Sequence, residues 1–328
     1  MNDQDLERLL KSVGPRELPP ADVERAVREQ LHDDWQAMLR ENRQRRNRRG
    51  AFALAASLVA ATFGLWIAST QSVGPSAAVG TLAVAVGEVR ERSGWLSGWR
   101  VMGDGDVVVA GRTLETGTDG RAAIALPGGM SLRVDRDTRI ALVDSSRLRL
   151  ERGTLYLDSG SGQARTAQLR VETPTGTVRH LGTQYELRLL DSGVQLRVRE
   201  GRVEFRSPTG LVEHGQSGEQ LVIFRDGRVQ RGEAPRAGPS WDWIADATPE
   251  LDLEGMSLTR FLAWAGRELG FAVTFAPAIR EAELASVIVH GSTSGLTPTE
   301  ALRAVFATTS FEATIVGDRI VVDRREPI

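Results

Sequence analysis

Residues 124–134 read I-A-L-P-G-G-M-S-L-R-V, two short runs in which apolar residues alternate with polar or small ones around a Pro-Gly-Gly turn. A period of two places the apolar side chains on one face of a strand, and such a turn between two runs is typical of a β-hairpin. The alternation continues from about Leu82 to Val229, with turns about every ten residues. It predicts a mainly-β domain over residues 82–229, built as a sandwich, a roll or a short solenoid.

The composition narrows the class of protein. The chain has 328 residues, with 41 basic and 43 acidic side chains and no cysteine. This length allows about two globular domains with smaller pieces. The near-zero net charge excludes a strongly basic nucleic-acid binder, and the lack of cysteine excludes disulfides and thiolate-bound metals.

The sequence contains little that could catalyse a reaction. Its histidines, His32, His180, His214 and His290, are scattered and do not have the spacing of a zinc-protease helix. Gly103-Asp104-Gly105-Asp106 lacks the later glutamate of an EF-hand loop, so a β-turn explains it. We therefore predict no catalytic residue, no cofactor and no metal site, and we do not expect an enzyme.

One apolar stretch, Ala51–Ser69, has the length of a membrane span. Its nineteen uncharged residues, as a helix rising about 1.5 Å per residue, match a hydrocarbon core of about 30 Å. A cleaved signal peptide and a buried core helix are the alternatives, but the stretch starts late and is long for the former. The arginines before it favour a single span with residues 1–49 cytoplasmic and residues 70–328 periplasmic. These topology determinants are Arg43, Arg45, Arg46, Arg48 and Arg49.

The segment before the arginines has the pattern of two amphipathic helices. Apolar residues recur at helical spacing on either side of a Pro-containing break, which gives each helix an apolar stripe. Two helices this short bury their stripes poorly against each other, so either a partner covers them or they form a self-packed hairpin. The stripe consists of Leu6, Leu9, Leu10, Val23, Val27, Leu31, Trp35 and Leu39.

The remainder of the chain divides into two linkers and a second domain. We assign residues 70–81 and 230–249 to linkers, because small residues, Gly and Pro interrupt any pattern there. Residues 250–325 alternate between strand and helix patterns. One helix begins after Ser257 and ends at Gly270, and another has Thr297 as its cap and Pro298 at its first position. This order predicts a small α+β domain.

Several stretches in the β region carry a family pattern in register. They are G-R-T-L-E-T-G-T-D-G-R-A at 111–122, L-P-G-G-M-S-L-R-V at 126–134, D-T-R at 137–139, L-E-R-G-T-L-Y at 150–156, V-E-T-P at 171–174, L-G-T-Q-Y at 181–185 and V-R-E-G-R-V at 198–203. Together they resemble the periplasmic domain of the FecR family. The positions that carry the pattern are Gly111, Thr116, Gly117, Gly128, Thr138, Arg139, Gly153, Thr173, Pro174, Gly182, Thr183, Tyr185, Glu200 and Gly201.

The resemblance extends to the other parts of the chain, and residues 250–325 resemble the secretin and TonB short N-terminal domain. It implies a regulator of the anti-sigma-factor type in the bacterial inner membrane. In such a protein the cytoplasmic stripe binds an extracytoplasmic-function sigma factor. The periplasmic part receives a signal from the signalling domain of a TonB-dependent outer-membrane transporter, which often imports iron chelates. An intramembrane protease is an expected partner by the same analogy.

The fold class expected from these parts is a multidomain membrane protein. It comprises a short α-helical cytoplasmic segment, one transmembrane helix, a mainly-β periplasmic domain and a small α+β C-terminal domain. The alternative function is a membrane-anchored envelope protein that binds a ligand or glycan or serves a structural role.

Overall fold

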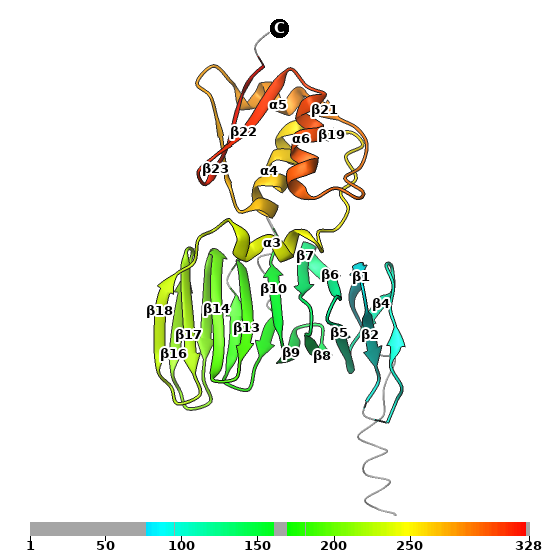
Figure 1. Cartoon of the computed structure of the whole chain (residues 1–328), viewed down its shortest axis with the longest axis vertical. Coiled ribbons are helices and arrows are strands. Elements are labelled where there is room, and N and C mark those ends of the chain that lie inside the picture. The colour runs from blue at the N-terminus through cyan, green and yellow to red at the C-terminus, as the bar shows by residue number, and fades with distance from the viewer. Residues whose placement is uncertain (1–76, 95, 161–168, 181, 326–328) are drawn as a thin grey trace, which may run out of the picture. The chain divides into compact units, whose positions relative to one another are not determined.

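Two β-sheets of nine strands each lie face to face and form the larger part of the fold (Figure 1). The computed structural model describes residues 77–94, 96–160, 169–180 and 182–325. Neighbouring strands pair antiparallel in both sheets, except β9 and β11, which pair parallel. Of the three architectures left open by the sequence, the structure is a sandwich.

Each sheet is described by its strands in spatial order. The first sheet, sheet A, contains β18 (Val229–Glu233), β17 (Glu219–Phe224), β14 (Gly193–Glu200), β13 (Gln184–Leu190), β10 (Thr154–Asp158), β7 (Met130–Val134), β6 (Arg121–Leu126), β1 (Ala78–Val86) and β4 (Val107–Val109). The second, sheet B, contains β16 (Val212–Gln216), β15 (Arg202–Arg206), β12 (Thr177–His180), β11 (Arg170–Glu172), β9 (Arg147–Arg152), β8 (Arg139–Asp144), β5 (Arg112–Thr116), β2 (Val89–Arg92) and β3 (Arg100–Val101).

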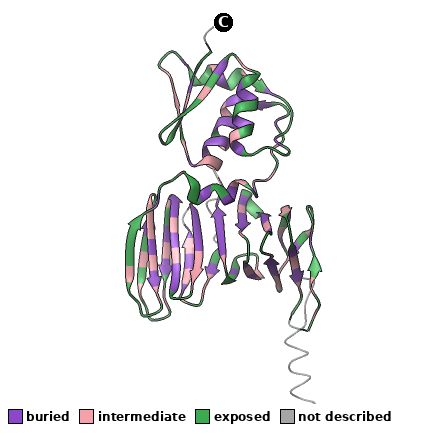
Figure 2. Cartoon of the chain, viewed as in Figure 1, coloured by how far each residue is buried: buried purple, intermediate pink, exposed green. Residues whose placement is uncertain are grey.

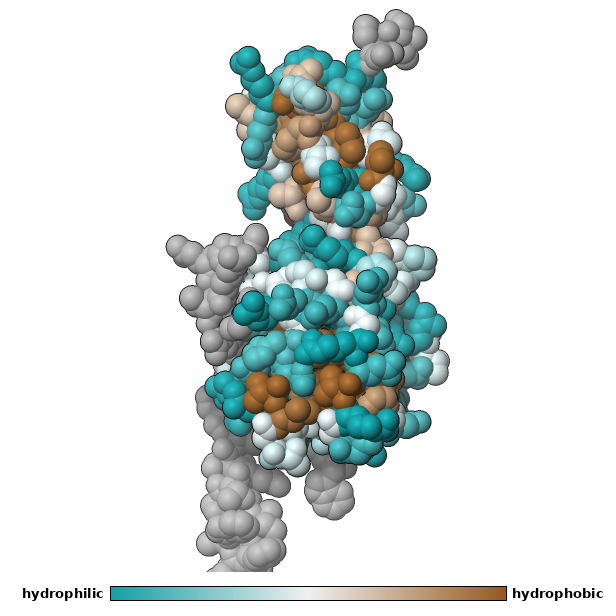
Figure 3. Space-filling model, turned by 90° about the vertical axis from the view of Figure 1, so that its left-hand side faces the viewer, coloured by the Kyte–Doolittle hydropathy of each residue, from teal (hydrophilic) through white to brown (hydrophobic). Residues whose placement is uncertain are grey.

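The apolar residues of the alternating pattern fill the space between the sheets. In β7, Met130, Leu132 and Val134 belong to one buried core, to which facing strands add residues such as Leu148 and Leu150. The strands carry buried and less buried residues in alternation (Figure 2). Burial of apolar area contributes roughly 25 cal/mol per Å², so this core is the main stabilising term of the sandwich. The end formed by β16 and β18 keeps apolar side chains at the surface (Figure 3), and Val212 is 39% exposed there.

Threonine hydroxyls and glycines hold the corners where the chain crosses between the sheets. The Thr116 hydroxyl donates to the carbonyl of Asp135 at 2.6 Å and accepts from the Thr138 amide at 3.0 Å. The Thr138 hydroxyl accepts in turn from the Thr154 amide at 2.9 Å. Gly153 has a φ of 88°, and a Cβ at this position would overlap Thr138. Glycine is required here for its backbone conformation and for the close approach.

The C-terminal module is a small α+β domain with its own core. Its strands make a two-stranded sheet and a three-stranded sheet, and its helices cover them. The elements are β19 (Met256–Ser257), α4 (Leu258–Leu269), β20 (Ala272–Phe275), α5 (Glu281–Ser286), β21 (Ile288–Val289), α6 (Pro298–Ala307), β22 (Phe311–Val316) and β23 (Arg319–Arg324).

The caps predicted for this module are confirmed. The Ser257 side chain accepts from the Arg260 amide at the start of α4, and Gly270 ends the helix with a φ of 75°. Thr297 and Glu300 form a reciprocal capping box at the start of α6. The short helix α5 was not predicted, because its six residues are too few for a clear period.

The segment between the domains, predicted as a linker, is partly packed on the sandwich. It contains a 3₁₀ turn at Pro239–Trp241 and a short helix, α3 (Asp242–Ala245). Trp241 is 3% exposed and Trp243 8%, and both pack with Tyr156 of β10. Two tryptophans therefore fix this segment to the outer face of sheet A.

The predicted fold class of a membrane protein with one transmembrane helix is wrong for what the structure describes. Those residues are mainly β, and none of their helices is both long and apolar enough to cross a membrane. The physical reason is that these helices have 12 residues or fewer and are amphipathic, with one apolar face packed on a domain core. The stretch Ala51–Ser69, the five arginines before it and the helical segment 1–49 lie outside the described residues.

One buried histidine predicts a pH dependence of stability. His180 is 2% exposed, and its Nε2 accepts from the Leu169 amide at 3.1 Å, so the ring is neutral. Burial lowers the pKa of His180 below the ordinary value of 6.5. The unfolded chain therefore takes up a proton at a higher pH than the folded chain, and stability falls as the pH drops below about 6.5.

We expect His180→Gln to reduce this acid sensitivity, because a glutamine oxygen accepts the same hydrogen bond and does not titrate in this range. The measurement is the melting temperature of both proteins at about pH 7.5 and about pH 5, above the range where most carboxylates titrate. An equal drop in melting temperature in the two proteins would show that His180 is not responsible.

Candidate functional site

A row of charged and aromatic side chains crosses the outer face of sheet A. Arg133, Tyr156, Glu186 and Arg197 are cross-strand neighbours on β7, β10, β13 and β14. Arg133 is 2% exposed, Tyr156 2% and Glu186 1%, although this face points away from the sandwich core. Buried charges are strongly destabilising unless they are paired and hydrogen-bonded, so the row needs a cover that supplies partners.

The tryptophan-containing segment supplies part of this cover. The Trp243 indole donates to Glu186 at 2.9 Å, and Arg197 donates to both oxygens of the same carboxylate at 2.7 Å. The Arg197 guanidinium lies 4.9 Å from the centre of the Trp241 ring, which also packs edge-on against Tyr156. Burial raises the pKa of Tyr156, so its hydroxyl stays protonated.

The C-terminal end of α4 supplies the remaining partners. Glu268 forms an ion pair with Arg133 at 2.7 Å. Arg199 of β14 donates to the backbone carbonyl of Glu268 at 3.0 Å, and Gln184 of β13 donates to that of Arg267 at 3.3 Å. The last carbonyls of a helix have no partners within the helix and carry its negative partial charge, so these side chains cap α4 from outside.

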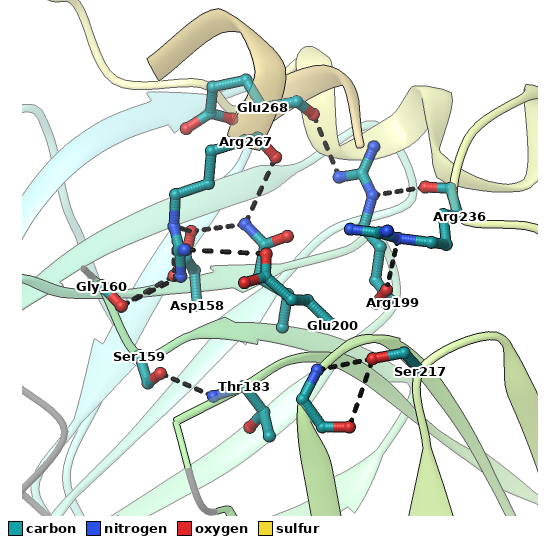
Figure 4. Close-up of polar contacts among 12 residues, drawn as sticks. Asp158, Ser159, Gly160, Thr183, Arg199, Glu200, Ser217, Arg236, Arg267 and Glu268 are labelled. Atoms are coloured by element: carbon teal, nitrogen blue, oxygen red, sulfur yellow. Dashed lines mark hydrogen bonds and ion pairs between the residues drawn. The ribbon is translucent and has the colours of Figure 1, made fainter. Parts of the chain in front are cut away.

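A second ion pair lies beside this cap (Figure 4). Arg267 binds the carboxylate of Asp158 at the end of β10 through Nε and Nη2, and Nη2 also donates to the carbonyl of Gly160 at 3.1 Å. Gln184 donates to the same carboxylate at 2.8 Å. Burial lowers the pKa of Arg267, but the hydrogen bonds and charge of Asp158 outweigh it and raise the pKa. We call the contacts of Arg267 and Glu268 with sheet A the joint.

A cavity of about 480 Å³ lies next to the joint. Sheet A contributes Gln184 and Glu200 to its lining, and α4 contributes Arg260, Trp264 and Arg267. The volume is that of a small-molecule site, yet the lining holds no nucleophile paired with a base. Among the residues that the structure describes, no group of three or more His, Asp and Glu side chains could hold a metal ion.

Most residues of the family pattern maintain the fold. Thr116, Thr138, Gly153, Thr183 and Gly201 stand at the corners, and Tyr185 is fully buried in the core. Gly111, Gly117, Gly128, Thr173, Pro174 and Gly182 lie in turns. One further residue of the family pattern, Glu200, lines the cavity next to the joint.

Arg139 of the family pattern lies on the outer face of sheet B. It forms an ion pair with Glu115, which also binds Arg90 at 2.7 Å. Burial raises the pKa of Glu115, but the hydrogen bonds from these two arginines outweigh it and lower the pKa. The predicted contact residues, from Leu6 to Leu39, lie outside the described residues.

Sequence reasoning missed the joint. Arg133, Asp158, Glu186, Arg267 and Glu268 occupy positions that normally face water on strands and helices, so their burial has no local signal. The pair Trp241 and Trp243 inside a Pro- and Gly-rich segment was an available indication, because tryptophans in a solvated linker are unusual.

A double-mutant cycle measures how strongly the ion pair of the joint stabilises the fold. Because Arg267 and Asp158 are mostly shielded and hydrogen-bonded, we expect their replacement by alanine, singly and together, to give a coupling energy of about 1.5–3 kcal/mol in unfolding. The exposed pair Arg228–Asp226 is a matched control and should give a clearly smaller coupling energy, because solvent screens exposed ion pairs. Equal coupling in the two pairs would mean that the joint is no stronger than a surface contact.

Comparisons with known proteins agree with the sequence pattern. Residues 112–204, which run from β5 to β15, match the family described as FecR protein. Two crystal structures of a candidate anti-sigma factor from Parabacteroides distasonis are similar at 15% identity and a TM-score of 0.34, covering 65% of this chain and 99% of that one. No curated protein matches. The family match confirms the resemblance inferred from the sequence, and residues 112–204 are similar to the FecR protein family.

Proposed function

We propose that this protein regulates an extracytoplasmic-function sigma factor and has no catalytic activity of its own. The observation that carries the proposal is the FecR match over residues 112–204. The joint supports it further, since a binding module attached to a β sandwich through buried ion pairs is suited to passing on a binding event.

The proposed contact with the sigma factor is the apolar stripe within residues 1–49. Its residues recur at helical spacing, and two short helices bury such a stripe poorly by themselves. Trp35 is the largest side chain of the stripe, and buried tryptophans are frequent hot spots of protein interfaces.

The proposed signal arrives at the sandwich and the C-terminal module, which we place in the periplasm. By resemblance to the FecR family, its source is the signalling domain of a TonB-dependent transporter, with iron-chelate uptake as the associated process. Regulated proteolysis by an intramembrane protease is the proposed relay to the sigma factor.

A substitution in the apolar stripe tests the proposed binding of the sigma factor. We expect Trp35→Ala to weaken binding of the sigma factor encoded beside this gene by at least about 30-fold, because loss of a buried aromatic hot spot costs about 2 kcal/mol or more. Glu29→Ala, on the polar side of the same segment, is the matched control and should change binding little. The measurement is the affinity of the purified full-length variants for the sigma factor.

Two outcomes contradict the proposal. One is no binding of the sigma factor at micromolar concentration by the unaltered chain. The other is equal binding by the Trp35→Ala and Glu29→Ala variants. Either would favour an envelope protein whose N-terminal segment serves only as an anchor.

A further inference from the structure

Five arginines line a groove on the outer face of sheet B, away from the joint. They are Arg147 and Arg149 of β9, Arg170 of β11, Arg179 of β12 and Arg206 of β15. The groove has a volume of about 510 Å³, and Glu172 is the acidic residue in its lining. This volume is within the usual range of small-molecule sites.

The register of the strands places three of these arginines side by side. Arg170 is the cross-strand partner of Arg147 on one neighbour and of Arg179 on the other. Neighbouring strands lie about 4.8 Å apart, and like charges directly opposite each other destabilise a sheet. The row contributes nothing to the core, which is formed by the alternate residues Leu148, Val171 and Val178.

The acidic residues nearby balance only part of the charge. Arg147 pairs with Asp144 at 2.8 Å, Arg149 with Glu172 at 3.0 Å and Arg206 with Glu204 at 3.1 Å. Among the described residues, no carboxylate forms an ion pair with Arg170 or Arg179. Glu204 lies directly across from Arg179 on β15, but it forms its ion pairs with Arg206 and His214. The centre of the groove therefore carries more guanidinium than carboxylate charge, beside the half-buried Thr177.

We propose that this groove binds a phosphoryl group in the form of a phosphate monoester or a diphosphate. Guanidinium groups bind carboxylates and phosphates through paired hydrogen bonds. One carboxylate has a single charge and suits one guanidinium, whereas a phosphoryl group carries up to two charges and three oxygens that several arginines bind together. Several arginines on adjacent strands therefore match the charge and the oxygens of a phosphoryl group better than those of a single carboxylate.

The test is titration of the purified full-length chain with inorganic pyrophosphate, followed by calorimetry at fixed ionic strength. We expect saturable binding at one site. The double variant Arg170→Gln, Arg179→Gln should lose about tenfold or more in affinity, because it removes two charged hydrogen-bond donors. Arg225→Gln, at an exposed arginine in the β17–β18 turn, is the matched control and should bind as the unaltered chain does.

Further arms distinguish the sources of the phosphoryl group. Binding to vesicles that contain phosphatidic acid, in addition to pyrophosphate, indicates a lipid headgroup, and binding to pyrophosphate alone indicates a soluble phosphate compound. Unchanged melting of the double variant shows that the fold is intact. The proposal is overturned if pyrophosphate does not bind, if the double variant and the Arg225→Gln control bind equally well, or if citrate binds as tightly as pyrophosphate.

Discussion

The burial of Arg133 and Glu186 on the outer face of sheet A constrains the rest of the described structure. A buried charge that loses its partner costs about 3–5 kcal/mol. Arg197 of the same sheet binds Glu186, and the remaining partners of these two residues come from outside the sandwich. Trp243 binds Glu186, and Glu268 binds Arg133 across 135 positions of sequence. The segment between the domains and the end of α4 are therefore structural parts of the sandwich surface.

Most residues of the FecR pattern lie at corners and in turns, apart from the arginine row on the outer face of sheet B. The pattern residues at the corners, such as Thr138 and Gly153, allow the chain to cross between sheets, so they specify the sandwich itself. The arginine row on sheet B does not contribute to the core and is destabilising by itself.

Local signals explain which features the sequence could predict. Alternation in β7 and the caps Ser257 and Thr297 act over a few residues, and the strands and helices they predict are present. The sequence could not select the sandwich over the other β architectures, because strand order depends on pairings such as β9 with β11 across residues 147–172. The joint was also unpredictable, since burial of Arg133 and Asp158 depends on residues more than one hundred positions away. The membrane-protein fold class was inferred from a stretch outside the described residues.

The buried ion pairs of the joint hold the C-terminal module in one position on the sandwich. Because the chain has no cysteine, spin labels can be attached at Asp191→Cys, in the β13–β14 turn, and at Arg303→Cys, on α6, without background. Pulsed electron spin resonance then measures the distribution of distances between them. We expect a single narrow distribution that broadens when Arg267→Ala is added. A broad distribution in the chain with an intact Arg267 would contradict the claim.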